Sequence, residues 1–595
     1  MARLKPGVTV ERANAEVQVL YESFVHGQAA KVQNAQERQR VLRQRAAVLA
    51  AAAGNSELRS QYAESLLVLM AIVALVLLLA CANLSSLLVA RAASRQREIS
   101  IRRAIGAGRG RLVRQFLAES LVLAVLGGVG GLVLARWFSN ALVVMMANGG
   151  RLDLRVGPDW RVLAFTGAVS LLACLMAGLA PAFHAAGSNV NPALKEVRTG
   201  GGTAWARRLG SALVIAQLSI SMVLLVGANL FIGTLLKLYR VESGFRTEGV
   251  LAFGVRSGER YPAARALEVQ TAIVDRLHSL PGVTSASAVQ LLPISNGLWD
   301  RTVQVEGYTF RTGEDERVGY NAIAPKYFAT MGTPLLLGRD FDTRDAMRAG
   351  KVAIVNESFA RHFFGGRSPV GRHVTSVNVT TEIIGVVKDA KYTNLRDAIP
   401  MTIYIPWTQR EDEQPTAYTY LAHVGGRDPM QLAAMLDRMA RDIDPALRVR
   451  SAETFAAIVD QSTVKERIMA ALGGFFGLLA LVVACLGIFG VMAFQVSRRI
   501  HELGVRMALG AGKSDILSLV LREVAYLLLA GSAIGCAAAL SVTRLAATML
   551  FGVTPTDPGV FGLSVAILGA ATFAAAWLPA QRASRVDPIA ALRQE

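Results

Sequence analysis

Cysteine and histidine are scarce in this chain, and neither residue type is arranged for chemistry. Only 4 cysteines and 7 histidines occur among the 595 residues. The cysteines, Cys81, Cys174, Cys485 and Cys536, all lie within long apolar runs, so the polar segments can form no disulfide. The histidines are scattered singly, and no two have metal-ligand spacing on a shared helical face beside a carboxylate. We therefore expect no metal site and no bound cofactor.

A complete nucleotide-binding loop is also missing. Gly510-Ala511-Gly512-Lys513-Ser514 resembles the end of the phosphate-binding motif G-x-x-x-x-G-K-[ST], but the position of the first glycine holds Met507. The equivalent segment in the first half of the chain reads Gly108-Arg109-Gly110, and no apolar strand precedes either copy. We expect no ATP binding by this chain. An energy source, if one is used, would lie on a separate polypeptide.

The polar segments show no catalytic constellation. Ser358, His362 and Asp342 lie near one another in sequence, but they are isolated residues of common types. A nucleophile needs a base and an orienting group beside it, and no spacing here indicates that arrangement. We therefore expect no catalytic residue, and the chain is not predicted to be an enzyme.

Charged residues are nearly absent from seven long apolar runs. The chain is 52% hydrophobic and 18% charged, and a helix needs about 20 mostly apolar residues to cross a bilayer. Helices of soluble proteins rarely run this long without a charged face. The runs are therefore predicted to be membrane-spanning helices, at residues 65–90, 117–147, 162–183, 209–236, 468–496, 524–543 and 558–581.

The net charge of +19 raises the question of nucleic-acid binding, and the distribution of that charge argues against it. The arginine and lysine clusters each adjoin an apolar run, and none is interleaved with the aromatic residues that single-stranded nucleic acids stack on. Positive charge beside membrane helices is the usual mark of cytoplasmic loops. We therefore expect a lipid bilayer as partner, and no nucleic acid.

The membrane part of the chain is repeated. The segment from Glu98 to Arg109 returns from Glu502 to Lys513, a shift of 404 positions. The same shift places Ala80-Cys81 on Ala484-Cys485, and it places Gly127 and Gly131 on Gly531 and Gly535. Each copy contains an apolar run, a basic connector with glycines and a second apolar run. The repeat predicts two homologous membrane halves.

These observations predict an α-helical polytopic membrane protein with about seven spanning helices and a large extracytoplasmic α+β domain. The positive-inside rule places the two connectors in the cytoplasm, and alternation then places 238–466 outside and the C-terminus inside. Residues 1–63 would also lie outside, although nothing upstream could export them, so we expect that an N-terminal span and most of a first exported domain are missing.

The expected domains are 1–63 for the C-terminal remnant of that first extracytoplasmic domain, 64–186 for a first three-helix membrane unit, 187–208 for a cytoplasmic linker, 209–237 for a membrane helix that opens the second half, 238–466 for a complete extracytoplasmic domain, and 467–595 for a second three-helix membrane unit.

Local patterns predict elements in the two polar regions. Thr9 is the candidate cap of an N-terminal helix, with Glu11 in its first turn. In the 238–466 region the predicted strands lie at 250–255, 283–292, 302–305, 352–355, 381–387 and 402–405. The predicted helices of that region lie at 262–280, 356–364 and 429–443.

The two connectors allow two interpretations. Their arginines could sit at the anionic inner leaflet, or the connectors could be docking elements for a cytoplasmic partner. Glu98 and Arg102, like Glu502 and Arg506, are four residues apart and can form an ion pair on one helix face, while Gly106, Gly108, Gly510 and Gly512 would end that helix. A leaflet anchor needs neither the pair nor the glycines, so docking is favoured.

Two glycine pairs at four-residue spacing predict close contacts between helices. Gly127 with Gly131, and Gly531 with Gly535, have the spacing of small-residue packing motifs. A tight static contact explains them as well as a hinge or a dimer face.

The connector motif, from Arg97 to Ala107 with its twin, resembles the MacB/FtsX-type permeases of ABC transporters in their tandem, duplicated form. The closing segment from Val586 to Arg593 resembles them too, as do three segments of the exported domain, Pro325–Phe328, Leu336–Phe341 and Val352–Glu357. The resemblance implies FtsX-like membrane units, a MacB-like periplasmic core domain and a place in the bacterial inner membrane.

The resemblance also implies a function. ATP hydrolysis by a separate cytoplasmic ABC ATPase would move the connectors and change the conformation of the exported domain, for export or extraction of a substrate. The alternative is an FtsX-like regulator that transmits this motion to a periplasmic or outer-face partner without transport. The residues themselves leave both functions open.

Overall fold

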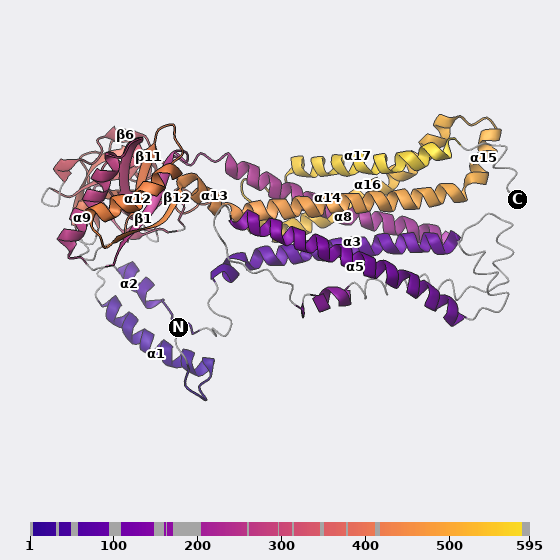
Figure 1. The fold of residues 1–595 in the computed structure, drawn as a ribbon, viewed down its shortest axis with the longest axis horizontal. Coiled ribbons are helices and arrows are strands. Elements are labelled where there is room, and N and C mark those ends of the chain that lie inside the picture. The colour runs from indigo at the N-terminus through magenta and orange to yellow at the C-terminus, as the bar shows by residue number, and fades with distance from the viewer. Residues whose placement is uncertain are drawn as a thin grey trace. The chain divides into compact units, whose positions relative to one another are not determined.

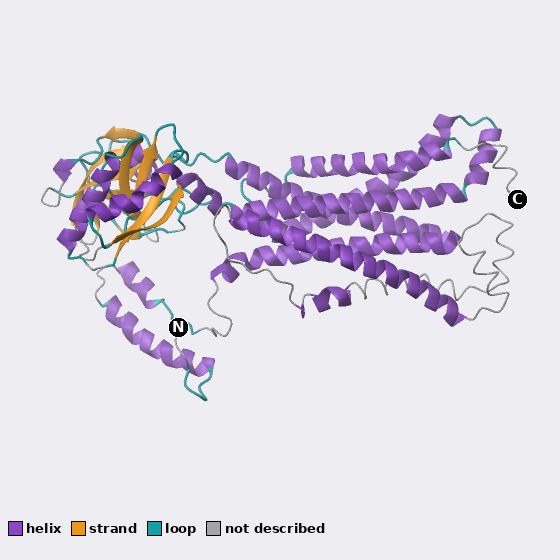
Figure 2. Ribbon diagram, viewed as in Figure 1, coloured by secondary structure: helices purple, strands orange, loops and turns teal. Residues whose placement is uncertain are grey.

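The computed structural model describes residues 4–30, 35–48, 57–94, 109–147, 160–161, 163–169, 204–258, 261–295, 297–311, 314–345, 350–376, 379–410 and 417–585 (Figures 1 and 2). The chain forms two compact units, Met1–Ala71 and Ile72–Glu595.

The described residues of the first unit form two helices and the start of a third. They are α1 (Val10–Ala29), α2 (Ala35–Leu42) and α3 (Glu57–Ser94), which continues into the second unit. The predicted cap is confirmed, because the Thr9 hydroxyl accepts a hydrogen bond from the Arg12 backbone N–H at 3.3 Å. The segment after α2 packs back on α1, where the Val48 N–H donates to Oδ1 of Asn14 at 2.8 Å.

Six helices of the described chain are long and apolar enough to cross a membrane. They lie at Ala63–Leu84, Val125–Val144, Gly210–Tyr239, Val464–Ser497, Lys513–Leu545 and Pro558–Ala583. These six confirm six of the seven predicted spans. The remaining one, 162–183, lies mostly outside the described residues, which include only the helical stretch 163–169 of it.

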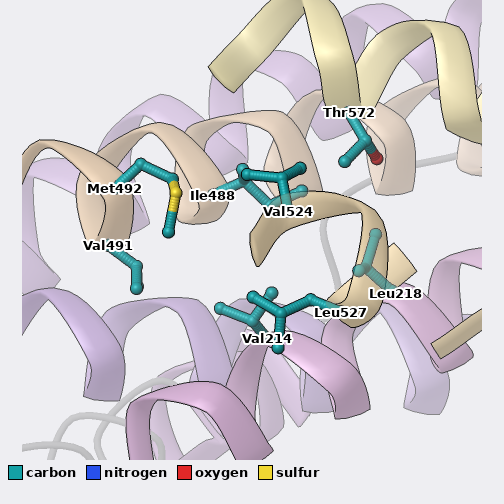
Figure 3. A pocket seen from close by; sticks show the side chains of 8 residues that line it. All are labelled: Val214, Leu218, Ile488, Val491, Met492, Val524, Leu527 and Thr572. Atoms are coloured by element: carbon teal, nitrogen blue, oxygen red, sulfur yellow. The ribbon is translucent and has the colours of Figure 1, made fainter. Parts of the chain in front are cut away.

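Four of these helices form a bundle in the second unit. They are α8 (Ala204–Tyr239), α14 (Val464–Arg498), α16 (Lys513–Leu545) and α17 (Pro558–Ala583), which lie side by side (Figure 1). Leu218, Val524 and Leu568 are among the side chains buried where they meet. Figure 3 shows a small apolar cavity between them, with Leu218, Val491 and Thr572 among its lining residues. The cavity has room for about one water molecule and is too small for a substrate.

The soluble part of the second unit, called the head below (residues 241–462), is built on a 12-stranded sheet. The strands are β1 (Val250–Ser257), β2 (Val283–Val289), β3 (Asp300–Thr302), β4 (Gln304–Val305), β5 (Arg317–Ile323), β6 (Leu335–Gly338), β7 (Val352–Asn356), β8 (His373–Ser376), β9 (Val379–Val387), β10 (Thr402–Pro406), β11 (Thr419–Val424) and β12 (Leu447–Thr454). The order across the sheet is β12-β1-β11-β2-β5-β10-β7-β9-β8-β4, with β3 paired to β5 and β6 paired to β9.

Helices cover both faces of this sheet, so its central strands are apolar on both sides. Along β7, Ala353 and Val355 point into one apolar cluster and Val352 and Ile354 into the other. The helices of the head are α9 (Ala263–His278), α10 (Tyr327–Met331), α11 (Glu357–Phe364), α12 (Met430–Ile443) and α13 (Phe455–Ser462). The chain passes from α13 into α14, so β12 and α13 lead from the sheet into the bundle (Figure 1).

The predicted elements of the head are present, although several others were missed. All six predicted strands and all three predicted helices have counterparts, with 302–305 divided between β3 and β4. The strands β5, β6, β8, β11 and β12 were not predicted. In β5 the fully buried Asn321 interrupts the apolar pattern, and it is accepted there because its amide bonds the backbone of Leu291 in both directions, at 3.1 and 2.8 Å.

Candidate coupling site

The second connector folds into a short helix between two long ones, called the elbow below (residues 499–512). It contains α15 (Ile500–Ala508), which follows α14 directly and is followed by α16. The predicted break at Gly510 is present. Its φ of +99° is a left-handed conformation that favours glycine, and the Ala511 N–H closes the turn on the Arg506 carbonyl at 3.0 Å. At the start of α16, the Asp515 carboxylate accepts from the Gly512 N–H at 2.9 Å.

The predicted ion pair is formed on the outward face of α15. Nη2 of Arg506 lies 2.8 Å from Oε1 of Glu502, and about half of each side chain is exposed. An exposed ion pair of this kind contributes only about 0.3–0.5 kcal/mol to the stability of the fold. A contribution to stability is therefore a weak explanation for the presence of this pair.

The same face of α15 also carries apolar residues. Val505 is 37% exposed and Leu509 is 83% exposed, while Leu503 on the opposite face is buried in the bundle. Glu502, Val505, Arg506 and Leu509 have the spacing of one helical stripe, at positions i, i+3, i+4 and i+7. The elbow therefore presents an exposed stripe of mixed apolar and charged character.

A second ion pair fixes the elbow to the bundle. Nη1 of Arg499, at the junction of α14 and α15, lies 3.0 Å from Oε2 of Glu523 on α16. Displacement of α15 would therefore also displace α14 and α16. The sequence gives no local sign of this pair, because Arg499 and Glu523 are 24 positions apart.

The residues predicted for the first connector, Glu98, Arg102, Gly106 and Gly108, lie outside the described residues.

The two glycine pairs differ in their surroundings. A Cβ at Gly531 would lie 2.6 Å from Cβ of Leu218, and one at Gly535 would lie 2.6 Å from Cβ of Met222, so α16 and α8 are in close contact there. At Gly127 and Gly131, on α5 (Arg109–Ala147), no atom of the described residues lies within 4 Å of the corresponding position. A helix-packing role for this first pair stays a prediction.

At the other end of α14, one arginine joins the head to the bundle. Arg396, in the loop between β9 and β10, places Nη1 3.1 Å from Oε1 of Glu466 on the first turn of α14. Its Nη2 donates to the carbonyls of Thr548 and Leu550, at 3.2 Å each, in the connection between α16 and α17. Glu466 is 8% exposed. This outer junction was missed by sequence reasoning, because nothing local marks Arg396 as different from the other arginines of the head.

The three residues considered as isolated catalytic types are not brought together. The Ser358 hydroxyl donates to Asp389 at 2.6 Å, His362 lies 3.0 Å from Glu314, and Asp342 pairs with Arg344 at 2.5 Å. The segment that resembled a phosphate-binding loop follows helix α15 and not a strand, unlike the loops of nucleotide-binding folds.

Two protein families match this chain. The family of the FtsX-like permease C-terminal domain matches twice, at residues 70–190 and 474–588. The family of the MacB-like periplasmic core domain matches residues 209–442.

Individual relatives agree with these families. The macrolide export ATP-binding/permease protein MacB of Rhodospirillum rubrum is 28% identical over 48% of this chain and 44% of its own length. The pyoverdine export ATP-binding/permease protein PvdT of Pseudomonas aeruginosa is 26% identical over 44% of this chain and 40% of its own. The chain thus spans less than half of either relative.

The solved structures that match include a periplasmic region and an extracellular domain of such proteins. The periplasmic region of MacB from Actinobacillus actinomycetemcomitans is 14% identical, with a TM-score of 0.26, over 39% of this chain and 97% of that one. The extracellular domain of the transporter YknZ from Gram-positive bacteria is 19% identical, with a TM-score of 0.23, over 34% of this chain and all of that one. From its family matches, with apolar helices around a periplasmic core domain, the chain belongs to the MacB/FtsX-type permeases of ABC transporters.

Proposed function

We propose that this chain is the permease subunit of an ABC-type exporter. A separate cytoplasmic ATPase would bind the elbow, and its ATP-driven motion would change the conformation of the head for export or extraction of a substrate. The names of the relatives, macrolide export and pyoverdine export, make macrolides and pyoverdine the first substrates to test.

One observation carries this proposal: α14 is a single helix that joins the elbow to the outer junction. It runs over 35 residues, a length of about 50 Å at 1.5 Å per residue. Its first turn is held to the head by Glu466 and Arg396, and its last residue adjoins the elbow. A continuous helix held at both ends transmits displacement between them, because its hydrogen-bonded backbone resists compression.

Within this proposal, the ATPase contacts the stripe of Glu502, Val505, Arg506 and Leu509, and Gly510 with Gly512 sets the angle at which α16 leaves the elbow. The matching residues of the first half, Glu98, Arg102, Gly106 and Gly108, would form a second docking element by the repeat. The head would be periplasmic and the C-terminus cytoplasmic, and the domain limits proposed from the sequence are retained.

The test is co-purification of the full-length chain with candidate ATPases after coexpression. We expect Glu502→Lys and Leu509→Glu each to lower the recovered ATPase by about tenfold or more, because losing a hot-spot residue of an interface costs about 2 kcal/mol or more and about 1.4 kcal/mol corresponds to a tenfold change in affinity. Arg265→Glu is the matched control, because Arg265 forms an equally exposed pair with Glu268 on the head, at 3.1 Å. Unchanged ATPase recovery with both elbow variants would remove the docking proposal.

The same preparation distinguishes export from regulation. Nucleotide-dependent protection of the head from proteolysis, together with transport of a macrolide or pyoverdine into inside-out vesicles, supports the exporter. Nucleotide-dependent protection without export of either compound favours the regulator alternative.

A further inference from the structure

A buried amide in the membrane part of the second unit has no hydrogen-bond partner. Gln217 on α8 has no exposed surface, and neither its Nε2 nor its Oε1 bonds any atom of the described chain. An unpaired polar group is costly where no water can reach it. Polar side chains inside a membrane segment usually have a specific role for that reason.

A glycine on the neighbouring helix makes the room for this amide. A Cβ on Gly487 of α14 would lie 2.5 Å from Oε1 of Gln217 and 2.9 Å from Oδ1 of Asn83. Nδ2 of Asn83, which comes from α3, donates to the Val483 carbonyl of α14 at 3.3 Å. Amides from α3 and α8 therefore meet against the bare backbone of α14.

The internal repeat relates the helices that meet at this point. The shift of 404 positions that relates the two halves places Asn83 on Gly487, so α3 and α14 are equivalent helices. The two helices meet at this equivalent position. The first half has the amide of Asn83 there, and the second half has Gly487, which has no side chain. Leu79 and Ala480, each without exposed surface, pack beside it with Leu224.

We propose that Asn83, Gln217 and Gly487 form an asymmetric amide joint that fixes the first membrane half against the second and selects this pairing over pairs of like halves. Two copies of the second half would bring two glycines together and leave Gln217 without a neighbouring amide. Two copies of the first half would place Asn83 of one copy against Asn83 of the other, without the room that Gly487 leaves. A single polar residue at a helix interface can select its partner in this way.

The chemistry of the joint is an interhelical amide–amide hydrogen bond. A half-turn of the terminal amide of Gln217 exchanges its oxygen and nitrogen, which turns its two N–H donors toward the carbonyl oxygen of Asn83. Such bonds between membrane helices contribute about 0.6 kcal/mol on average. The joint would hold whether the protein exports a substrate or regulates a partner.

The test is cross-linking in membranes that contain the full-length chain. Leu79→Cys and Val483→Cys are introduced after the native cysteines are replaced by alanine, and a protease site is inserted between residues 190 and 209. A bis-maleimide then joins the halves, and cleavage separates the chains that were not cross-linked. Cross-links between two copies through Val483→Cys alone report pairing of like halves.

We expect Gln217→Leu and Asn83→Leu each to lower the yield of joined halves by about threefold, the effect of one interhelical hydrogen bond. Gly487→Asn should lower it further and Asn83→Gly should raise the yield between copies, while the swap Asn83→Gly with Gly487→Asn should recover most of the joined product. The control is Asn229→Leu, which removes another α8 amide whose bond, to Ser564 on α17 at 2.8 Å, stays within the second half.

Equal yields for wild type, Gln217→Leu and Asn83→Leu would overturn the proposal, as would a swap variant no better than Gly487→Asn alone. A loss of yield in Asn229→Leu equal to that in Gln217→Leu would also overturn it, because general loosening of the bundle would then explain both.

Discussion

At the scale of single residues, the segments of the head that resemble the family have structural explanations. A Cβ on Gly338, whose φ is +76°, would lie 2.0 Å from the Ile384 carbonyl oxygen, so only glycine fits there. Asn356 caps α11 by accepting from the Phe359 N–H at 3.2 Å, and its Nδ2 donates to Asp389 at 2.9 Å. Gly338 and Asn356 stabilise the fold of the head, whereas Arg396 and Glu466 join the head to the bundle.

Arg396→Gln should uncouple the head from the bundle. Removing one member of a fully buried pair costs about 3–5 kcal/mol, and we expect about 2–3 kcal/mol here because a quarter of the Arg396 side chain remains exposed. The thermal midpoint in detergent should fall and export should decline, while recovery of the ATPase stays as in wild type. The double variant with Glu466→Gln should be less impaired than the sum of the single variants; strict additivity would contradict coupling through this pair.

Acid should weaken the head through Glu306. The side chains of His373 and Arg372 hydrogen-bond its carboxylate and lower its pKa from 4.5 to about 2. Because the pKa is lower in the folded protein, the resulting stabilisation is present above pH 4.5 and is lost as the pH falls from 4.5 towards 2.

Glu306→Gln should therefore lower the thermal midpoint at pH 7, and the difference from wild type should shrink between about pH 5 and pH 3. Glu242→Gln, a change at a 90% exposed side chain, is the control. A difference that grows on acidification would contradict the predicted direction.

At the scale of elements, α16 and α8 are in close contact within the bundle. Gly531 and Gly535 allow the two helices to approach, and the Ser219 hydroxyl donates to the Gly531 carbonyl at 3.0 Å across the contact. The equivalent glycines of α5 are not in such a contact within the described residues. The repeated sequence therefore has different surroundings in its two copies.

Gly535→Ala should destabilise the protein by about 1–3 kcal/mol, because the new methyl group would overpack against Met222 and the Ser219 carbonyl. Gly131→Ala, at the twin position, should change stability little. Thermal midpoints of both variants in one detergent provide the measurement, and equal losses would show that the contact in the second half has no special importance.

At the scale of the whole molecule, the proposal requires the elbow and the head to lie on opposite sides of the membrane. Ser279→Cys on the head and Ala508→Cys on α15 are both exposed positions suited to labelling, in a background without the native cysteines. In intact spheroplasts, a membrane-impermeant maleimide should label the first variant and not the second. Labelling of both before permeabilisation would contradict the proposed topology and the proposed function with it.

The sequence by itself determined the membrane spans, the internal repeat, the Thr9 cap and the Glu502–Arg506 pair. These features depend on residues close in the chain, where hydropathy and helical spacing act directly. The family also followed from the sequence, because the connector motif is local and occurs twice.

Only the tertiary structure decided which distant residues meet. The outer junction joins residues 70 or more positions apart, and the amide joint brings together helices separated by more than 100 residues. Neither the outer junction nor the amide joint is marked by a local sequence pattern. The residues around an arginine or an amide do not indicate whether its side chain is exposed or pairs with a distant partner. Packing in three dimensions made Arg396 the link to the bundle and made Gly487 the space for Asn83 and Gln217.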